Sequence, residues 1–137
     1  MNSETIESYN KVAKEYKEIH NDVAEIKQFI DFFIQKIKGK KILDVGCGPG
    51  IQAEYFSRQG FDVTAIDLAE SFLSMGKQNA KEVNFIKMDM KNLKFQNSAF
   101  DGLWVCGSFS HIKKDTAQKT INDFNKALKQ NGLLFIS

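Results

Sequence analysis

The sequence predicts a doubly wound α/β domain, in which helices cover both faces of a parallel β-sheet. Short apolar segments alternate with longer segments that carry apolar residues at every third or fourth position. A glycine-rich turn follows one of the short segments, and no internal repeat or Gly/Ser-rich linker interrupts the alternation. We expect one domain, because the chain has 137 residues and single domains centre on about 100–150 residues.

The first part of the chain is predicted to form two amphipathic helices. Apolar residues recur at helical spacing over residues 3–19 and again over residues 22–37. Gly39 is expected to end the second helix, because glycine tolerates the left-handed cap conformation. We therefore divide the single domain into N-terminal helices over residues 1–38 and a sheet-forming core over residues 39–137.

The core is predicted to alternate between strand and helix. Five strands are expected, each short, apolar and bounded by turn residues, at residues 41–46, 61–67, 83–88, 101–105 and 133–136. Helices are expected between them at residues 50–59, 70–80 and 115–130. Asp115 favours the start of the last helix, and Asn131 with Gly132 is expected to end it.

Composition and charge exclude several classes of protein. The 19 basic and 17 acidic residues leave a net charge of +2, and the lysines are scattered, so the basic stripe typical of nucleic-acid binders is missing. No apolar run approaches the roughly 20 residues of a membrane span. The N-terminal segment lacks the features of a secretory signal, and Cys47 and Cys106 are expected to be reduced thiols. We expect a cytoplasmic protein with no nucleic-acid or membrane partner.

The strongest functional signal is a glycine-rich turn directly after the first core strand. Asp44 precedes three glycines at alternate positions, Gly46, Gly48 and Gly50. Glycines there allow a tight turn and a close approach of ligand to the main chain, and the next helix begins beside them. The spacing departs from the dinucleotide fingerprint G-x-G-x-x-G, whose third glycine would fall on Ile51. A turn that is merely tight would not need so many glycines, so we interpret it as a ligand site.

Two further acids follow the next two strands. Asp67 ends the second core strand, where a carboxylate can accept both hydroxyls of a ribose. Asp89 follows the third strand between two methionines, where a carboxylate can accept an exocyclic amine. Taken alone, each is equally well explained as a turn or cap residue. Together with Asp44 they place three carboxylates at strand ends, which suits a positively charged, nucleotide-like ligand better than a pyrophosphate.

These segments resemble the class I S-adenosylmethionine-dependent methyltransferases. Residues 42–50, 63–67 and 86–90 resemble that family's glycine-rich motif, ribose-binding strand end and adenine-binding segment, and residues 100–105 and 127–135 resemble its fourth and fifth strands. Tyr9, Ala13 and Tyr16 have the spacing that opens its small-molecule methyltransferase subgroup. The resemblance implies a Rossmann-like sheet of order 3-2-1-4-5, S-adenosyl-L-methionine as cofactor and a small-molecule methyl acceptor.

The resemblance also implies roles for the residues of the glycine-rich turn. Gly46, Gly48 and Gly50 would line the methionine part of the cofactor, to which Cys47 would contribute its backbone. Asp44 would lie beneath the loop and contact the amino-acid end of the cofactor, directly or through water.

The resemblance places the rest of the cofactor on later segments. Asp67 would bind the ribose hydroxyls, and Leu68 would pack against the adenine. Asp89 would accept the adenine amine, and the backbone N–H of Met90 would contact a ring nitrogen. The main chain near Cys106 would face the methionine amino group.

Three side chains complete the candidate site. Tyr9 and Tyr16 would close over the cofactor, or else belong to the apolar stripe of their helix. His111 is the candidate general base, which is needed only if the acceptor atom arrives protonated, and a locally packed histidine is its alternative. No cluster of histidines, cysteines and acids has metal-ligand spacing, so we expect no metal.

The sequence departs from the family pattern after the fifth strand. The family's sheet normally has seven strands, whereas this sequence stops at Ser137. We expect a chain truncated after the fifth strand, either a monomer or a dimer formed through that exposed edge. Two alternatives to an active methyltransferase remain open. One is a cofactor-binding fragment without turnover, and the other is a nicotinamide-dependent oxidoreductase, which would leave Asp89 unexplained.

Overall fold

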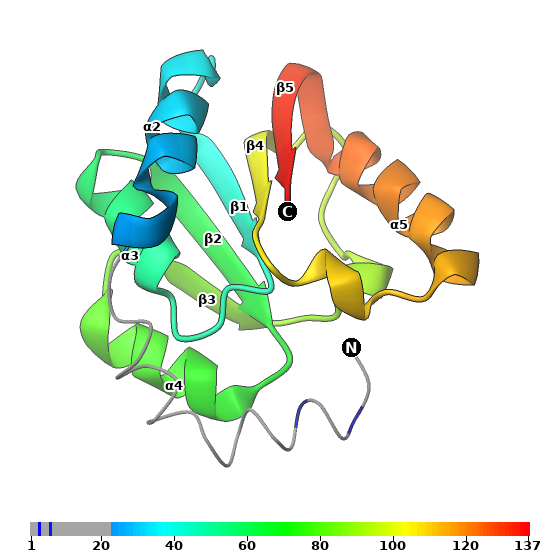
Figure 1. Cartoon of the computed structure of the whole chain (residues 1–137), viewed down its shortest axis with the longest axis horizontal. Helices are drawn as coiled ribbons and strands as arrows, with labels where there is room; N and C mark the ends of the chain where they lie inside the picture. The colour runs from blue at the N-terminus through cyan, green and yellow to red at the C-terminus, as the bar shows by residue number, and fades with distance from the viewer. Residues whose placement is uncertain (1–2, 4–5, 7–22) are drawn as a thin grey trace.

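A parallel β-sheet lies at the centre of the computed structural model, which describes residues 3, 6 and 23–137 (Figure 1). Its strand order is β3-β2-β1-β4-β5, and every pairing is parallel. The strands are β1 (Lys41–Val45), β2 (Asp62–Asp67), β3 (Asn84–Lys87), β4 (Phe100–Val105) and β5 (Leu128–Ile136). The predicted fold class and strand order are confirmed.

Helices cover both faces of this sheet (Figure 1). The helices are α2 (Lys27–Lys36), α3 (Ile51–Arg58), α4 (Glu70–Asn79) and α5 (Lys114–Ala127), with 3-10 turns η1 (Ala24–Ile26), η2 (Met90–Asn92) and η3 (Phe109–His111). Helices α2, α3 and α4 pack on one face and α5 on the other. Side chains alternate along each strand, so Ile42 of β1 joins the first layer of the core and Leu43 joins the second.

Trp104 of β4 forms the centre of the core beneath α2 and α3. Its ring is fully buried, meets Phe33 and Phe56 edge-on at centroid distances of 5.2 and 5.3 Å, and stacks on Phe135 at 4.0 Å. The indole Nε1–H donates to Oε1 of Gln52 at 2.6 Å, which satisfies the polar edge of the ring. These contacts fix β4 and β5 relative to α2 and α3.

The junction between α5 and β5 differs from the prediction. The helix ends at Ala127 rather than at residue 130, and the strand begins at Leu128 rather than at residue 133. The carbonyls of Lys126 and Ala127 accept hydrogen bonds from the loop before β4, so a longer helix is not needed to satisfy them. Residues 129–132 bulge out between the Phe100–Leu128 and Gly102–Leu133 pairs, and Asn131 takes a φ of 65° within that bulge.

Gly39 does not cap the preceding helix as predicted. Helix α2 ends at Lys36 with an extended Ile37, and Gly39 does not adopt a positive φ. A Cβ at Gly39 would instead overlap the carboxylate of Asp101, which accepts a hydrogen bond from the Lys41 amide at 3.0 Å. Position 39 requires glycine because the side chain of Asp101 in β4 packs against the main chain at that position.

The other core elements begin and end within two residues of their predicted bounds. The helix predicted over residues 3–19, together with Tyr9 and Tyr16, lies outside the described residues except at positions 3 and 6.

Candidate functional site

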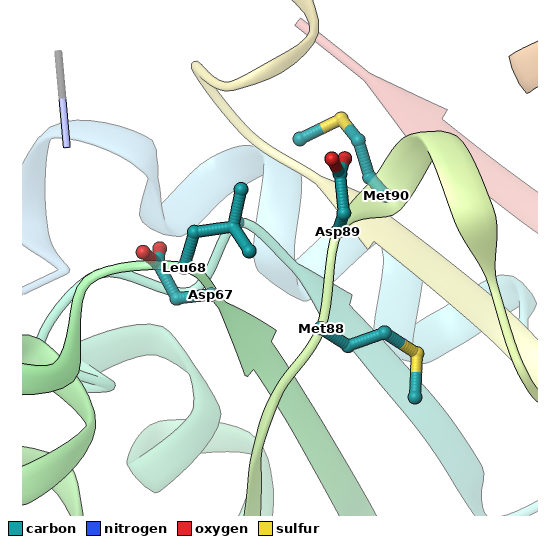
Figure 2. Close-up of a pocket in the computed structure, with 6 residues that line it drawn as sticks. Asp67, Leu68, Met88, Asp89 and Met90 are labelled. Atoms are coloured by element: carbon teal, nitrogen blue, oxygen red, sulfur yellow. The ribbon is translucent and has the colours of Figure 1, made fainter. Parts of the chain in front are cut away.

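The candidate site is a cleft at the carboxyl ends of the central strands. It has a volume of about 240 Å³, including space open to solvent, and its lining consists of Gly46, Asp67, Leu68, Met88, Asp89 and Met90. Figure 2 shows Leu68 reaching from the end of β2 toward Asp89 and Met90 on the segment after β3. Strand β1 has β2 on one side and β4 on the other, and open α/β sheets bind ligands at such a reversal of strand order.

Asp44 of β1 is a buried carboxyl group with an unsatisfied oxygen. Its side chain is 2% exposed, and Oδ2 has no hydrogen-bond partner among the described residues. Burial, followed by the negative charge of Asp67, raises the pKa of Asp44 to about 8. Asp44 is therefore mostly protonated at neutral pH, and an ammonium group beside Oδ2 would satisfy that oxygen and favour the carboxylate.

The glycine-rich turn is held against the end of β2. Gly46 and Gly48 have φ values of 70° and 56°, which glycine adopts without a steric penalty. The amides of Gly46 and Cys47 both donate to the carbonyl of Ile66 at 2.9 Å, and the Gly48 amide donates to Oδ2 of Asp67 at 2.9 Å. Because these amides already have protein partners, the turn offers a ligand mainly a close approach to its backbone.

Asp67 has hydrogen bonds on both carboxylate oxygens. Oδ2 accepts from Gly48, and Oδ1 accepts from the Ala69 amide at 2.9 Å. Burial raises the pKa of Asp67, while the backbone hydrogen bonds and His111 act in the opposite direction. Each carboxylate oxygen can accept more than one hydrogen bond, so Asp67 retains acceptor capacity while it holds the turn.

The segment after β3 forms the opposite side of the cleft. Asp89 caps η2, where its Oδ1 accepts from the Lys91 amide at 2.9 Å, and its Oδ2 lies 3.9 Å from Lys91 Nζ. Met90 is 6% exposed and lines the cleft floor with Gly46. Asp89 is therefore a cap residue, as its alternative explanation proposed, and the cap hydrogen bond occupies Oδ1.

Gly50 packs against the interior and does not line this cleft. Its φ is 83°, and a Cβ there would lie 2.6 Å from Cζ of Phe85 in β3. The same ring also fills the space beside Gly76 of α4. The packing of β3 against α3 and α4 explains the third glycine of the motif, and its place along the methionine part of the cofactor stays a prediction.

The two cysteines are free thiols in different surroundings. Cys47 Sγ lies 3.4 Å from the Gly48 carbonyl, and burial raises the pKa of this thiol well above its usual value. A thiol that remains protonated is a poor nucleophile, and a contribution of Cys47 through its backbone stays a prediction. Cys106 Sγ lies 3.6 Å from Ser137 Oγ, which also accepts from the Gly107 amide at 3.0 Å. These contacts hold the loop after β4 against the end of β5.

His111 lies at the end of η3, in the loop between β4 and α5. Its amide donates to the carbonyl of Ser108 at 3.2 Å. His111 is one of the groups that lower the pKa of Asp67, whose side chain lines the cleft.

Ser108 is a site residue that sequence reasoning missed. It is 4% exposed, its Oγ donates to the carbonyl of Val45 at 2.9 Å, and a Cβ on Gly46 would lie 2.6 Å from that oxygen. The only sequence signal is a small polar residue shortly after a predicted strand, and serines are common in such loops.

The described part of the chain has neither a metal-binding cluster nor a membrane-spanning helix. Residues 3, 6 and 23–137 contain no group of three or more His, Cys, Asp or Glu side chains that could hold a metal ion. Of the helices that the structure describes, none is long and apolar enough to cross a membrane.

Comparison with known proteins assigns the family. A family model described as a methyltransferase domain matches residues 42–132, a range that contains the glycine-rich turn and all three acids. A ubiquinone biosynthesis O-methyltransferase of Pelagibacter ubique is 30% identical over 158 residues, covering 100% of this chain and 65% of that protein. A demethylmenaquinone methyltransferase of Renibacterium salmoninarum is 26% identical over 135 residues, covering 94% of this chain and 56% of that protein.

The solved structures agree with this assignment. The crystal structure of a TehB-like SAM-dependent methyltransferase from Corynebacterium glutamicum has a TM-score of 0.72 and 26% identity, and the match covers 96% of this chain and 71% of that one. The chain thus has the sheet, the glycine-rich turn and the strand-end acids of a known cofactor-binding fold, although it spans only part of its relatives' length. It belongs to the methyltransferase domain family, as a class I S-adenosylmethionine-dependent member.

Proposed function

We propose that this chain binds S-adenosyl-L-methionine in the cleft and forms the cofactor-binding part of an enzyme that methylates a small molecule. The observation that carries the proposal is the buried Oδ2 of Asp44, which has no hydrogen-bond partner among the described residues and belongs to a residue two positions before Gly46. An unpaired buried carboxyl oxygen suits a cationic ligand, and S-adenosylmethionine carries an ammonium group at its amino-acid end. A nicotinamide dinucleotide would bring a pyrophosphate to the same place.

The residues around Asp44 fit the amino-acid end of the cofactor. Gly46 lines the cleft, and the absence of a side chain on Gly48 would let a ligand approach the backbone there. The main chain at Cys106, held by the contacts of Gly107 and Ser137, would face the amino group from the side of β4.

The opposite half of the cleft fits an adenosine. Asp67 would accept the ribose hydroxyls with its remaining lone pairs, and Leu68 would cover one side of the base. Asp89 would accept the exocyclic amine through Oδ2, because Oδ1 is occupied by the Lys91 amide. Met90 would present its backbone N–H to the ring.

The chain's own residues act mainly by orientation. The bound cofactor supplies a methyl group on a sulfonium, whose displacement leaves a neutral thioether. Fixing a donor and an acceptor at the right distance can supply much of the acceleration of such a reaction. His111 would remove a proton from acceptors that arrive protonated.

The acceptor is proposed to be a small molecule. Two relatives carry the names ubiquinone biosynthesis O-methyltransferase and demethylmenaquinone methyltransferase. Those names support small-molecule methylation, and oxygen and carbon acceptors are both compatible with the same cofactor site. The acceptor and the turnover of the complete protein are part of the proposal, since the chain covers 56% of the second relative's length.

We further infer a cytoplasmic protein, which is a monomer or a dimer formed through β5. Free thiols at Cys47 and Cys106 are compatible with a reducing compartment. Strand β5 pairs with β4 and forms one edge of the described sheet, so its other side offers backbone groups to a further strand. Residues 39–137 would form the cofactor-binding core and residues 1–38 its N-terminal helices.

Calorimetric titration with S-adenosylhomocysteine tests the proposal, with NADH as the competing candidate. We expect saturable binding of S-adenosylhomocysteine at one site per chain and no binding of NADH. Asp89→Asn should weaken binding by about tenfold, since a hydrogen bond to a charged group is worth about 1.5–3 kcal/mol. Asp123→Asn is the matched control, because Asp123 pairs with Lys119 on α5. Binding of NADH alone, or an equal loss in both variants, would contradict the proposal.

A further inference from the structure

Ser108 is a buried residue just beyond the end of the ladder that joins β1 and β4. The parallel ladder between these strands extends to the Asp44–Trp104 pair. One residue further along β1, the Val45 carbonyl accepts a hydrogen bond from Ser108 Oγ at 2.9 Å. A side chain from the loop after β4 therefore bridges the two strands just beyond the end of their ladder.

The same residue organises the turn that carries His111. Ser108 is the N-terminal flanking residue of η3, and its carbonyl accepts the His111 amide at 3.2 Å. Its side chain and its backbone thus bind two different segments, β1 through Val45 and η3 through His111. Ser108 is 4% exposed, so both its hydroxyl and its carbonyl belong to a buried residue.

Ser108 also explains why position 46 is a glycine. A Cβ on Gly46 would lie 2.6 Å from Ser108 Oγ, so the serine side chain occupies the space that any larger residue would need. This contact places Ser108 directly against the glycine-rich turn, which the hydrogen bond between Gly48 and Asp67 also holds.

We propose that Ser108 is a positioning residue, which fixes the glycine-rich turn at Gly46 relative to the 3-10 turn η3 that carries His111. The inference rests on the proposed function, because it assigns a purpose to the distance between a bound cofactor and a candidate base. Without the hydroxyl, the Val45 carbonyl loses its bridge to the loop after β4, and a buried carbonyl without a partner is unfavourable. The glycine-rich turn and η3 would then shift independently of each other.

Ser108→Ala tests this directly, because alanine keeps the Cβ and removes only the hydroxyl. Thr120→Val is the matched control. Thr120 is another buried hydroxyl, 1% exposed, which donates to the Thr116 carbonyl at 2.9 Å within α5. Each variant is titrated with S-adenosylhomocysteine and with 5′-methylthioadenosine, which lacks the amino-acid end that the loop would hold.

The inference predicts a selective loss of affinity. Ser108→Ala should weaken S-adenosylhomocysteine binding about fivefold or more, the effect of losing roughly one hydrogen bond, and should change 5′-methylthioadenosine binding by less than about twofold. Thr120→Val should leave the ratio of the two affinities unchanged. An unchanged ratio in Ser108→Ala would overturn the inference while leaving the proposed function intact. Failure of the unmodified chain to bind S-adenosylhomocysteine would contradict both.

The imidazole of His111 supplies a second readout. In the unmodified chain, S-adenosylhomocysteine should change the chemical shifts of the His111 imidazole protons, and in Ser108→Ala that change should be reduced. His20 is the only other histidine in the sequence, so a His20→Gln variant assigns the signals. Should Ser108→Ala fail to fold, Ser108→Cys keeps a side chain of similar shape with a weaker donor, and the same affinity ratio decides the question.

Discussion

The carboxylate of Asp67 accepts a hydrogen bond from the Gly48 amide, with 2.9 Å between nitrogen and oxygen. This bond joins the last residue of β2 to the glycine-rich turn after β1, so the acid expected to bind a ribose also shapes the loop expected to hold the methionine part. Variants of Asp67 therefore affect the whole site and not one contact alone.

Asp67→Ala should destabilise the fold as well as weaken ligand binding. Removing the carboxylate leaves the Gly48 and Ala69 amides without their partner, at a cost of about 1–3 kcal/mol for each group that stays buried. Asp67→Asn keeps one acceptor oxygen and should cost less. Urea unfolding measures the difference, and equal stability of the two variants would show that these hydrogen bonds do not hold the turn.

Binding of S-adenosylhomocysteine should strengthen as the pH rises from 6 toward 7.5. The pKa of Asp44 is raised to about 8, so the group is mostly protonated over this range, whereas an ammonium ligand needs the carboxylate. If the ligand keeps Asp44 charged, the affinity gains up to about tenfold per pH unit, because one proton is released on binding. Calorimetry in buffers of different ionisation enthalpy counts that proton. Asp44→Asn should abolish the pH dependence, and its persistence in this variant would assign it to another group.

The ligand-free fold should respond to pH in the opposite sense. The folded pKa of Asp44 lies above its unfolded value of 3.8, so the folded state binds the proton more tightly. The contribution of Asp44 to stability is therefore full below about pH 4 and decreases toward pH 8, by about 1.4 kcal/mol per pH unit. Asp44→Asn should be more stable than the unmodified chain at pH 8 and bind ligand less well. Urea unfolding at pH 5 and pH 8 checks this, and a variant that is less stable at pH 8 would contradict it.

Two glycines with left-handed backbones should differ in their tolerance of alanine. Gly50 and Gly60 have φ values of 83° and 95°, but a Cβ on Gly50 would meet the ring of Phe85 and a Cβ on Gly60 would meet nothing within 4 Å. Gly60→Ala should cost about 1–2 kcal/mol from the backbone alone. Gly50→Ala should cost more, by about 1–3 kcal/mol, because the core must also accommodate the extra methyl. Denaturant unfolding compares the two, and equal losses would mean that Phe85 moves freely.

Cys47→Ala should leave S-adenosylhomocysteine binding within about twofold of the unmodified chain. The thiol packs against the core and donates to the Gly48 carbonyl at 3.4 Å, while its amide is the group bonded to Ile66. Because its pKa is raised by burial, Cys47 should also react slowly with alkylating reagents at pH 7. Mass spectrometry of the alkylated chain measures this rate, and rapid modification of Cys47 would contradict the raised pKa of its thiol.

Most of the fold could be predicted from the sequence, because the strands and helices follow clear apolar periods. The junction after α5 could not, since Leu128 suits both a helical stripe and a strand. The hydrogen bonds that Lys126 and Ala127 accept come from residues some thirty positions earlier, at Ser98 and Ala99. The role of Gly39 could not be predicted either, because glycine is required there by the side chain of Asp101, which lies in a distant strand.

The candidate site was predictable where spacing carries the signal. Asp67 and Asp89 were identified because each follows a strand end, and both line the cleft. Ser108 could not be identified from the sequence, because the reason for it is a hydrogen bond to Val45 of β1. The ring of Phe85 packs beside Gly50, and the place of Gly50 at the ligand stays a prediction.

The most direct test of the central claim is an amide ¹H–¹⁵N spectrum of the chain with and without S-adenosylhomocysteine. If the cofactor binds in this cleft, the amide signals of Gly46, Leu68 and Met90 should shift on saturation. The signal of Gly60, which follows the C-terminal end of α3, should stay in place. Shifts that are absent, or that gather away from the carboxyl ends of β1, β2 and β3, would contradict the claim.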